Sequence, residues 1–167
     1  MRKPNFFIIG APKCGTTSLV AYLSDHPNVY ISPVKEPHFF NTDMRWHDIN
    51  VPNRDAYMDL FRAASSEHLA IGEASTTYLY SAAAVPNILQ FNPDAKFIVM
   101  IRNPLEMAQA LHGELLWNHN EDIEDFEHAW YLQPDRKQGR HVPKHCLLPE
   151  WLQYRDVCKV GEQLERL

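Results

Sequence analysis

The stretch FFIIGAPKCGTTSL, residues 6–19, decides the fold of this chain. It opens with four apolar residues typical of a buried strand, and from Thr16 onward its apolar residues have helical spacing. The loop between the two runs from Gly10 to Gly15. In such a loop the backbone N–H groups and the positive end of the helix dipole converge on one phosphate-sized volume. The stretch therefore predicts an anion-binding loop at the carboxyl end of a strand.

The spacing of Gly10 and Gly15 is that of a P-loop, but the lysine is displaced. Thr16 stands where a nucleotide kinase or ATPase has its lysine, and Lys13 lies inside the loop instead. The strongest strand of the chain ends at Arg102 rather than at an aspartate, which also disfavours a divergent P-loop kinase or NTPase. A plain turn is a further alternative, although such turns rarely carry a lysine and two threonines together.

Apolar runs and helical spacing alternate along the rest of the chain. Short runs predict further strands at 29–31, 69–72 and 96–101. Helices are expected at 16–24, 54–64, 81–91, 104–117, 121–131 and 157–167, and a polar loop at 133–149. Alternating strands and helices favour a P-loop-like three-layer α/β/α fold with a central parallel sheet, in one domain over 1–167.

Composition limits the functions that are open to the chain. Its 167 residues carry a formal charge of −5, which provides no overall basic field for nucleic acid. Cys14, Cys146 and Cys158 show neither a disulfide framework nor zinc spacing, which favours a reducing compartment. No apolar run approaches membrane-spanning length, so a cytoplasmic location is expected. No metal site is predicted, and the oligomeric state is open.

Two further loops carry candidate chemistry. Glu36, flanked by Lys35 and Pro37 just after a strand, could act as a general base, with Lys13 and Lys35 as cationic support. An exposed Lys-Glu pair is the alternative for this loop. Arg102 follows a buried strand and could grip a phosphate, or it could cap the helix that follows.

Four segments together resemble the PAPS-dependent sulfotransferases, whose sulfuryl donor is 3′-phosphoadenylyl sulfate (PAPS). Residues 7–19 resemble the family's 5′-phosphosulfate loop, in the form of its bacterial and heparan sulfate (carbohydrate) branch. Residues 35–40, KEPHFF, resemble the segment with the catalytic glutamate, and residues 96–104 resemble the 3′-phosphate segment. Residues 72–79 are similar to the family's Gly-Glu-x-Ser-x-x-Tyr segment, whose hydroxyls could line the acceptor cleft or form a simple polar turn.

The resemblance implies a single in-line transfer of a sulfuryl group from PAPS to a hydroxyl or amine of a carbohydrate or small metabolite, without a metal. Glu36 is then the base, Lys13 supports the leaving phosphate, Lys35 contacts substrate or sulfate, and Arg102 binds the 3′-phosphate. His38 is a lesser candidate in the same segment. The resemblance assigns the 5′-phosphosulfate to Pro12, Lys13, Cys14, Gly15, Thr16, Thr17 and Ser18.

The chain also departs from the family pattern. Met107 and Ala110 stand where the family has an arginine and a phosphate-binding serine, so one contact of about 1.5–3 kcal/mol is missing. Family members continue beyond 157–167 into another core strand and a Gly-rich loop, so the sheet is expected to be incomplete and the chain to correspond to the N-terminal, cofactor-binding portion. A degenerate, non-catalytic nucleotide-binding domain is therefore the second hypothesis.

Overall fold

The computed structural model describes residues 2–44 and 51–167. It divides into two compact units, the first reaching Ile101 and including Leu167, the second spanning Arg102–Arg166. Each unit has its own buried apolar side chains. That 1–167 acts as a single domain stays a prediction.

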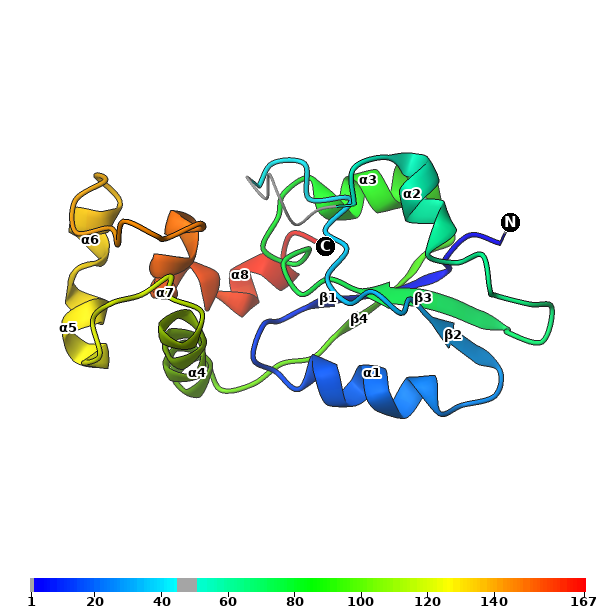
Figure 1. The fold of residues 1–167 in the computed structure, drawn as a ribbon, viewed down its shortest axis with the longest axis horizontal. Helices are drawn as coiled ribbons and strands as arrows, with labels where there is room; N and C mark the ends of the chain where they lie inside the picture. Colours follow the sequence, from blue (N-terminus) through cyan, green and yellow to red (C-terminus); the bar gives the residue numbers. More distant parts are fainter. Residues whose placement is uncertain (1, 45–50) are drawn as a thin grey trace. The chain divides into compact units, whose positions relative to one another are not determined.

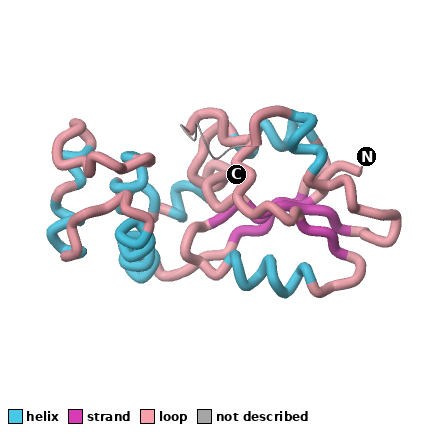
Figure 2. Tube along the Cα trace, viewed as in Figure 1, coloured by secondary structure: helices cyan, strands magenta, loops and turns pink. Residues whose placement is uncertain are grey.

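The first unit is built on a four-stranded parallel sheet with the order β2-β3-β1-β4 (Figure 2). Its strands are β1 (Phe6–Gly10), β2 (Val29–Ile31), β3 (Ala70–Ala74) and β4 (Lys96–Val99). β1 is buried along its whole length, because it has a strand on either side and helices on both faces. The predicted parallel α/β sheet is confirmed.

Helices cover both faces of this sheet. α1 (Thr16–Ser24) lies on one face, and α2 (Arg54–Asp59) and α3 (Ala84–Phe91) lie on the other (Figure 1). Successive β1 residues point to opposite faces. Phe6 and Ile8 pack with the α1 side, where Leu19, Val20 and Leu23 meet them.

Aromatic side chains fill the opposite face. The ring of Phe40 lies 5.9 Å from Phe7 of β1, 5.1 Å from Tyr57 of α2 and 5.4 Å from Phe91 of α3. Phe40 belongs to the predicted catalytic loop 35–40, so this packing ties the loop to the hydrophobic core. The two edge-to-face contacts, with Phe7 and Tyr57, each add about 0.5–1.5 kcal/mol beyond the buried area.

The second unit is helical. Its elements are α4 (Pro104–Trp117), α5 (Phe126–Tyr131), α6 (Gln133–Arg136), η1 (Pro149–Leu152), α7 (Tyr154–Val157) and α8 (Val160–Leu164). Pro104 occupies the first turn of α4, and the side chain of Asn103 caps this helix by accepting a hydrogen bond from the N–H of Leu105. The expected helix at 104–117 is confirmed at both ends.

Three expectations for this unit were wrong in detail. The expected loop 133–149 begins with α6, because Pro134 fits the first turn of a helix. The expected helix 121–131 begins only at Phe126, since Asp125 caps it and Glu121 instead accepts the N–H groups of Asp122 and Ile123. The expected helix 157–167 is interrupted between α7 and α8 and ends at Leu164.

Two helices of the first unit are shorter than the ranges predicted from the sequence. The helix predicted at 54–64 ends at Asp59, and turns follow it. The helix predicted at 81–91 begins at Ala84, because the Ser81 hydroxyl accepts the N–H groups of Ala83 and Ala84.

In the described ranges, no helix is long and apolar enough to cross a membrane.

Candidate active site

The loop after β1 has the backbone of an anion site. Gly15 is the N-cap of α1 and adopts a left-handed conformation, φ 81°, and a side chain there would meet nothing within 4 Å. The positive φ, rather than crowding, is therefore what favours glycine. The cap forms no side-chain hydrogen bond, and the first turn of α1 has no acidic residue. The first N–H groups of α1 thus keep the positive end of the helix open to an anion.

Some of the residues predicted to bind the 5′-phosphosulfate are buried and others are exposed. The side chains of Pro12, Cys14 and Thr16 are buried, and the thiol of Cys14 donates to the carbonyl of Pro12 at 3.4 Å. Lys13, Thr17 and Ser18 are exposed. The buried members shape the loop from within, and the exposed members present one ammonium and two hydroxyls. Lys13 is also left-handed, with φ 60°.

The second loop leaves β2 and runs past the carboxyl end of β3. The N–H of Glu36 donates to the carbonyl of Ala74 at 2.8 Å. Glu36 and His38 both have positive φ, 58° and 51°. Non-glycine residues in this region cost about 1–3 kcal/mol each and persist only where their surroundings hold them. Such positions occur often at functional sites, so the strain is consistent with a catalytic loop.

The Glu36 carboxylate is held on three sides. Its Oε1 accepts hydrogen bonds from the ammonium of Lys35 at 2.8 Å and from the hydroxyl of Thr76 at 3.0 Å. Its Oε2 accepts one from the N–H of Thr76 at 2.9 Å. The side chain of Glu36 remains 24% exposed, so the anchored carboxylate is still reachable from solvent.

Thr76 joins this carboxylate to the end of β1. The N–H of Ser75 donates to the carbonyl of Ile8 at 3.0 Å, and the N–H of Leu79 donates to that of Ile9 at 2.8 Å. A Cβ placed on Gly10 would lie 3.1 Å from the carbonyl of Thr76. The segment that clamps Glu36 therefore lies against the first residue of the anion loop. Thr76 thus links the two predicted loops at the carboxyl ends of β1 and β3, where ligands bind in open parallel sheets.

His38 is a buried neighbour of the Glu36 carboxylate. Its Nδ1 lies 3.0 Å from the hydroxyl of Thr77, and its Nε2 lies 3.7 Å from Oε2 of Glu36. Burial lowers the pKa of His38; the charge of Glu36 opposes this and that of Lys35 adds to it. His38 is therefore a neutral, buried neighbour of the proposed base at physiological pH.

Glu73 is the glutamate of the segment 72–79, for which the sequence predicted a role of the hydroxyls but none of the carboxyl. It lies on β3, fully buried, and accepts hydrogen bonds from the hydroxyls of Tyr57, Tyr78 and Ser75 at 3.0, 2.9 and 2.8 Å. Burial raises the pKa of its carboxyl to about 7, against the lowering effect of these hydrogen bonds. The signal was available, since a glutamate inside an apolar strand is rare unless it is paired.

Arg102 is the first residue of the second unit. Its side chain is 44% exposed, and its Nε donates to Oε2 of Glu106 at 2.9 Å. Asn103, not Arg102, caps α4. Met107 is fully buried in the second unit and Ala110 is partly buried, so neither side chain presents a polar group. Of the predicted 3′-phosphate segment 96–104, two charged side chains are exposed, Lys96 at its start and Arg102 near its end.

Comparison with known proteins decides the family. Residues 4–158, almost the whole chain, match the sulfotransferase family. The chain belongs to this family. A solved sulfotransferase from Alicyclobacillus acidocaldarius is 34% identical and superposes with a TM-score of 0.86, covering 99% of this chain and 68% of that one. The P-loop-like α/β fold of the family is thereby confirmed.

Curated sulfotransferases from animals are also similar. Mouse carbohydrate sulfotransferase 15 is 35% identical over 166 residues, 74% of this chain and 29% of that protein. Human bifunctional heparan sulfate N-deacetylase/N-sulfotransferase 3 is 29% identical over 161 residues, 90% of this chain and 18% of that protein. The chain spans less than a third of the length of either relative. The predicted resemblance to the carbohydrate and heparan sulfate branch is confirmed at the level of the family.

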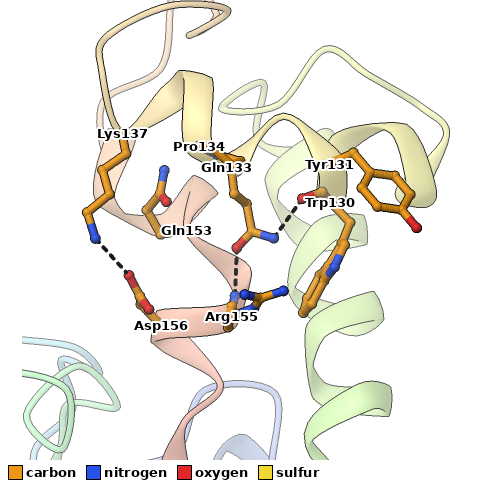
Figure 3. Close-up of a pocket in the computed structure, with 8 residues that line it drawn as sticks. All are labelled: Trp130, Tyr131, Gln133, Pro134, Lys137, Gln153, Arg155 and Asp156. Carbon is orange, nitrogen blue, oxygen red and sulfur yellow. Dashed lines mark hydrogen bonds and ion pairs between the residues drawn. The ribbon is translucent and has the colours of Figure 1, made fainter.

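The second unit of this sulfotransferase-family chain has a pocket of about 290 Å³ (Figure 3). Some of its polar groups contact one another: Gln133 donates to the carbonyl of Trp130 and accepts from the N–H of Arg155, both at 2.8 Å, and Lys137 lies 3.7 Å from Asp156. None of the predicted site residues lines it. Among residues 2–44 and 51–167, no group of three or more histidine, cysteine, aspartate or glutamate side chains could hold a metal ion.

Proposed function

We propose that this chain binds PAPS through the loop 10–18 and catalyses sulfuryl transfer to a hydroxyl or amine of a carbohydrate or small metabolite. One observation carries the proposal. Thr76, which lies against the start of the anion loop, holds the carboxylate of Glu36 with both its N–H and its hydroxyl. A candidate base and a candidate phosphate site thus share one edge of the sheet.

The residues of the loop fit the phosphosulfate end of PAPS. The N-terminus of α1 lacks a side-chain cap, and Lys13 with Thr17 adds exposed polar groups beside it. When bound, PAPS supplies the sulfuryl group and a phosphate that gains negative charge as it leaves. Lys13 places a positive charge in the loop to stabilise that phosphate, and the helix N-terminus contributes fixed N–H donors.

Glu36 is the proposed base. Within the described residues, its Oε1 accepts two hydrogen bonds, which fix the carboxylate, whereas its Oε2 accepts one. A carboxylate oxygen has two lone-pair sites, so Oε2 retains one for the proton of an acceptor hydroxyl or amine. Lys35 balances the charge of the carboxylate through its contact at 2.8 Å with Oε1, and it is the proposed contact of the substrate or sulfate.

Arg102 is proposed as the 3′-phosphate ligand on the resemblance of its segment. Its exposed guanidinium would exchange Glu106 for the phosphate, a stronger and doubly charged partner. We expect Arg102→Gln to weaken binding of 3′,5′-adenosine bisphosphate about tenfold, the scale of one charge-assisted hydrogen bond. Binding of 5′-AMP, which lacks the 3′-phosphate, should change less than twofold.

A second candidate function is nucleotide binding without turnover. The buried Met107 and the apolar Ala110 favour it, since neither supplies the phosphate contact of the family pattern. The two hypotheses differ in the fate of PAPS. A binding domain holds the bisphosphate but releases none from PAPS, whatever acceptor is present.

The deciding experiment has two parts. Calorimetric titration compares 3′,5′-adenosine bisphosphate with 5′-AMP and with ATP plus Mg²⁺. Turnover is then followed as bisphosphate released from PAPS in the presence of a glucosamine tetramer, which offers both amines and hydroxyls, or of a simple phenol. Preference for the bisphosphate together with acceptor-dependent release supports the proposal. Preference for ATP with Mg²⁺ would replace it by a divergent NTPase.

Variants of the two proposed catalytic side chains complete the test. Lys13→Ala should reduce turnover by at least 100-fold, the scale of losing one preorganised charge at the leaving group. Glu36→Gln should reduce turnover by about 10²–10⁴-fold while bisphosphate binding stays within twofold, because the base acts only on the acceptor. Lys3→Ala and Glu67→Gln, exposed residues of the first unit outside the segments that resemble the family, are the matched controls. Wild-type turnover in Lys13→Ala or Glu36→Gln would remove that residue from the mechanism.

A further inference from the structure

Glu73 has no role in the proposed transfer step, yet hydrogen bonds through Ser75 and Tyr78 connect its carboxyl to the predicted catalytic loop 35–40. Glu73 is fully buried on β3, and within the described residues it forms no ion pair. Its two oxygens accept only hydroxyl donors: Tyr57 and Tyr78 on Oε1, and Ser75 on Oε2. Burying a carboxyl without a cation is costly, and packing alone does not account for a carboxyl at this position.

Two of the three hydroxyls also contact the loop that carries Glu36. The oxygen of Ser75 accepts the N–H of His38 at 3.2 Å. The oxygen of Tyr78 accepts the N–H of Phe39 at 3.0 Å and lies 3.4 Å from that of Phe40. The backbone N–H groups of three consecutive loop residues therefore point to the Ser75 and Tyr78 hydroxyls, and both hydroxyls donate their protons to the Glu73 carboxyl.

The direction of these hydrogen bonds is set by Glu73. A hydroxyl has one proton and two acceptor sites. Because Glu73 accepts the protons of Ser75 and Tyr78, the remaining lone pairs of both hydroxyls face the loop as acceptors. Without an acceptor at this position, the hydroxyl protons could turn toward the loop N–H groups, and donor would face donor.

The loop needs such support. Glu36 and His38 both hold left-handed backbone conformations, which relax unless neighbouring groups fix them. Thr76 fixes the Glu36 side chain, whereas Ser75 and Tyr78 fix the backbone that follows it. We propose that Glu73, acting through Ser75 and Tyr78, is the positioning residue that holds the 36–40 backbone so that Glu36 meets the acceptor. The inference rests on the proposed function of Glu36 as the base.

Tyr57 provides a matched control. Its hydroxyl donates to the same oxygen of Glu73 as that of Tyr78, and both rings are fully buried. Of these two tyrosines, Tyr78 accepts the N–H of Phe39 through its hydroxyl, whereas among the described residues the Tyr57 hydroxyl has no contact with the backbone of 36–40. Tyr57→Phe and Tyr78→Phe therefore each remove one hydroxyl donor from the same oxygen of Glu73. Tyr78→Phe also removes a hydrogen bond to the loop backbone, whereas Tyr57→Phe does not.

The experiment measures kcat and KM for PAPS in wild type, Glu73→Gln, Tyr78→Phe and Tyr57→Phe, using the acceptor that supports turnover of the wild type. We expect kcat to fall about 10- to 100-fold in Glu73→Gln and Tyr78→Phe, the scale of a misplacement of about 1 Å. KM for PAPS and calorimetric binding of the bisphosphate should stay within twofold, which also shows that each variant is folded. Tyr57→Phe should keep kcat within threefold.

Hydrogen exchange separates this inference from the proposed function. The amides of residues 38–40 should exchange at least tenfold faster in Tyr78→Phe than in Tyr57→Phe, whether or not turnover is measured. Equal losses of kcat in the two tyrosine variants, or an unchanged kcat in Tyr78→Phe from an active wild type, would overturn the positioning role alone. A wild type that binds bisphosphate but turns over no acceptor would overturn both proposals. If Tyr78→Phe does not fold, Ser75→Ala removes the acceptor of the His38 N–H and takes its place.

Discussion

Replacing Glu73 by glutamine should change how the stability of this protein depends on pH. Burial raises the pKa of the Glu73 carboxyl from 4.5 to about 7, the three hydroxyl donors oppose this rise, and the charge of Glu36 adds to it. The folded protein therefore binds the Glu73 proton more tightly than the unfolded chain does. This contribution to stability is complete below pH 4.5 and is lost as the pH rises toward 7. The gap of about 2.5 between the two pKa values corresponds to about 3 kcal/mol.

The assay is urea denaturation followed by far-UV circular dichroism between pH 4 and pH 8.5. Glutamine keeps the shape of the side chain but cannot ionise. The free energy of unfolding of Glu73→Gln, relative to wild type, should therefore rise by about 3 kcal/mol across this range. His38, whose pKa is lowered by burial, is present in both proteins, so its own titration largely cancels in the difference.

Direct titration of the Glu73 carboxyl carbon by NMR provides an independent measurement. It should show a midpoint near 7, above those of exposed glutamates. A midpoint near 4.5, together with a stability difference that stays flat within about 1 kcal/mol, would refute the reasoning. The hydroxyl donors would then outweigh the loss of hydration on burial.

Two further predictions concern packing and a buried ion pair. Gly72→Ala should destabilise the first unit by about 1–3 kcal/mol in the same denaturation assay, because its new Cβ would lie 2.5 Å from the ring of Phe6; an unchanged midpoint would mean that the ring moves freely. Arg136→Met should cost about 3–5 kcal/mol, since it leaves the carboxylate of Glu121 buried without its cation, whereas Lys159→Met in an exposed pair should cost less than about 1 kcal/mol. Equal effects of Arg136→Met and Lys159→Met would contradict this difference.

Much of the fold could be predicted from local sequence. The strand at the start of the chain, the loop 10–15 and the helix from Thr16 were predicted because glycine positions and apolar spacing act over a few residues. Pro104 marked the start of α4 for the same reason. The element boundaries were less accurate where a cap or a buried polar group intervened, as at Glu121 and Asp125.

The candidate site could be predicted only in part. Lys13, Glu36 and Arg102 were named from residue type, loop position and family resemblance, and their roles stay predictions. The contacts that hold Glu36 were not foreseen, because Thr76 lies 40 residues away along the chain. The same is true of Glu73, whose partner Tyr57 is 16 residues away.

The sequence by itself determined the strands, the anion loop and the chemical groups available to this protein, since these depend on neighbours along the chain. The tertiary structure decided which of those groups meet. The order β2-β3-β1-β4 places the carboxyl end of β3 between those of β2 and β1. Hydrogen bonds act only within about 3 Å, so the clamp of Thr76 on Glu36 and the support of the loop by Glu73 exist only once the sheet has brought these strand ends together.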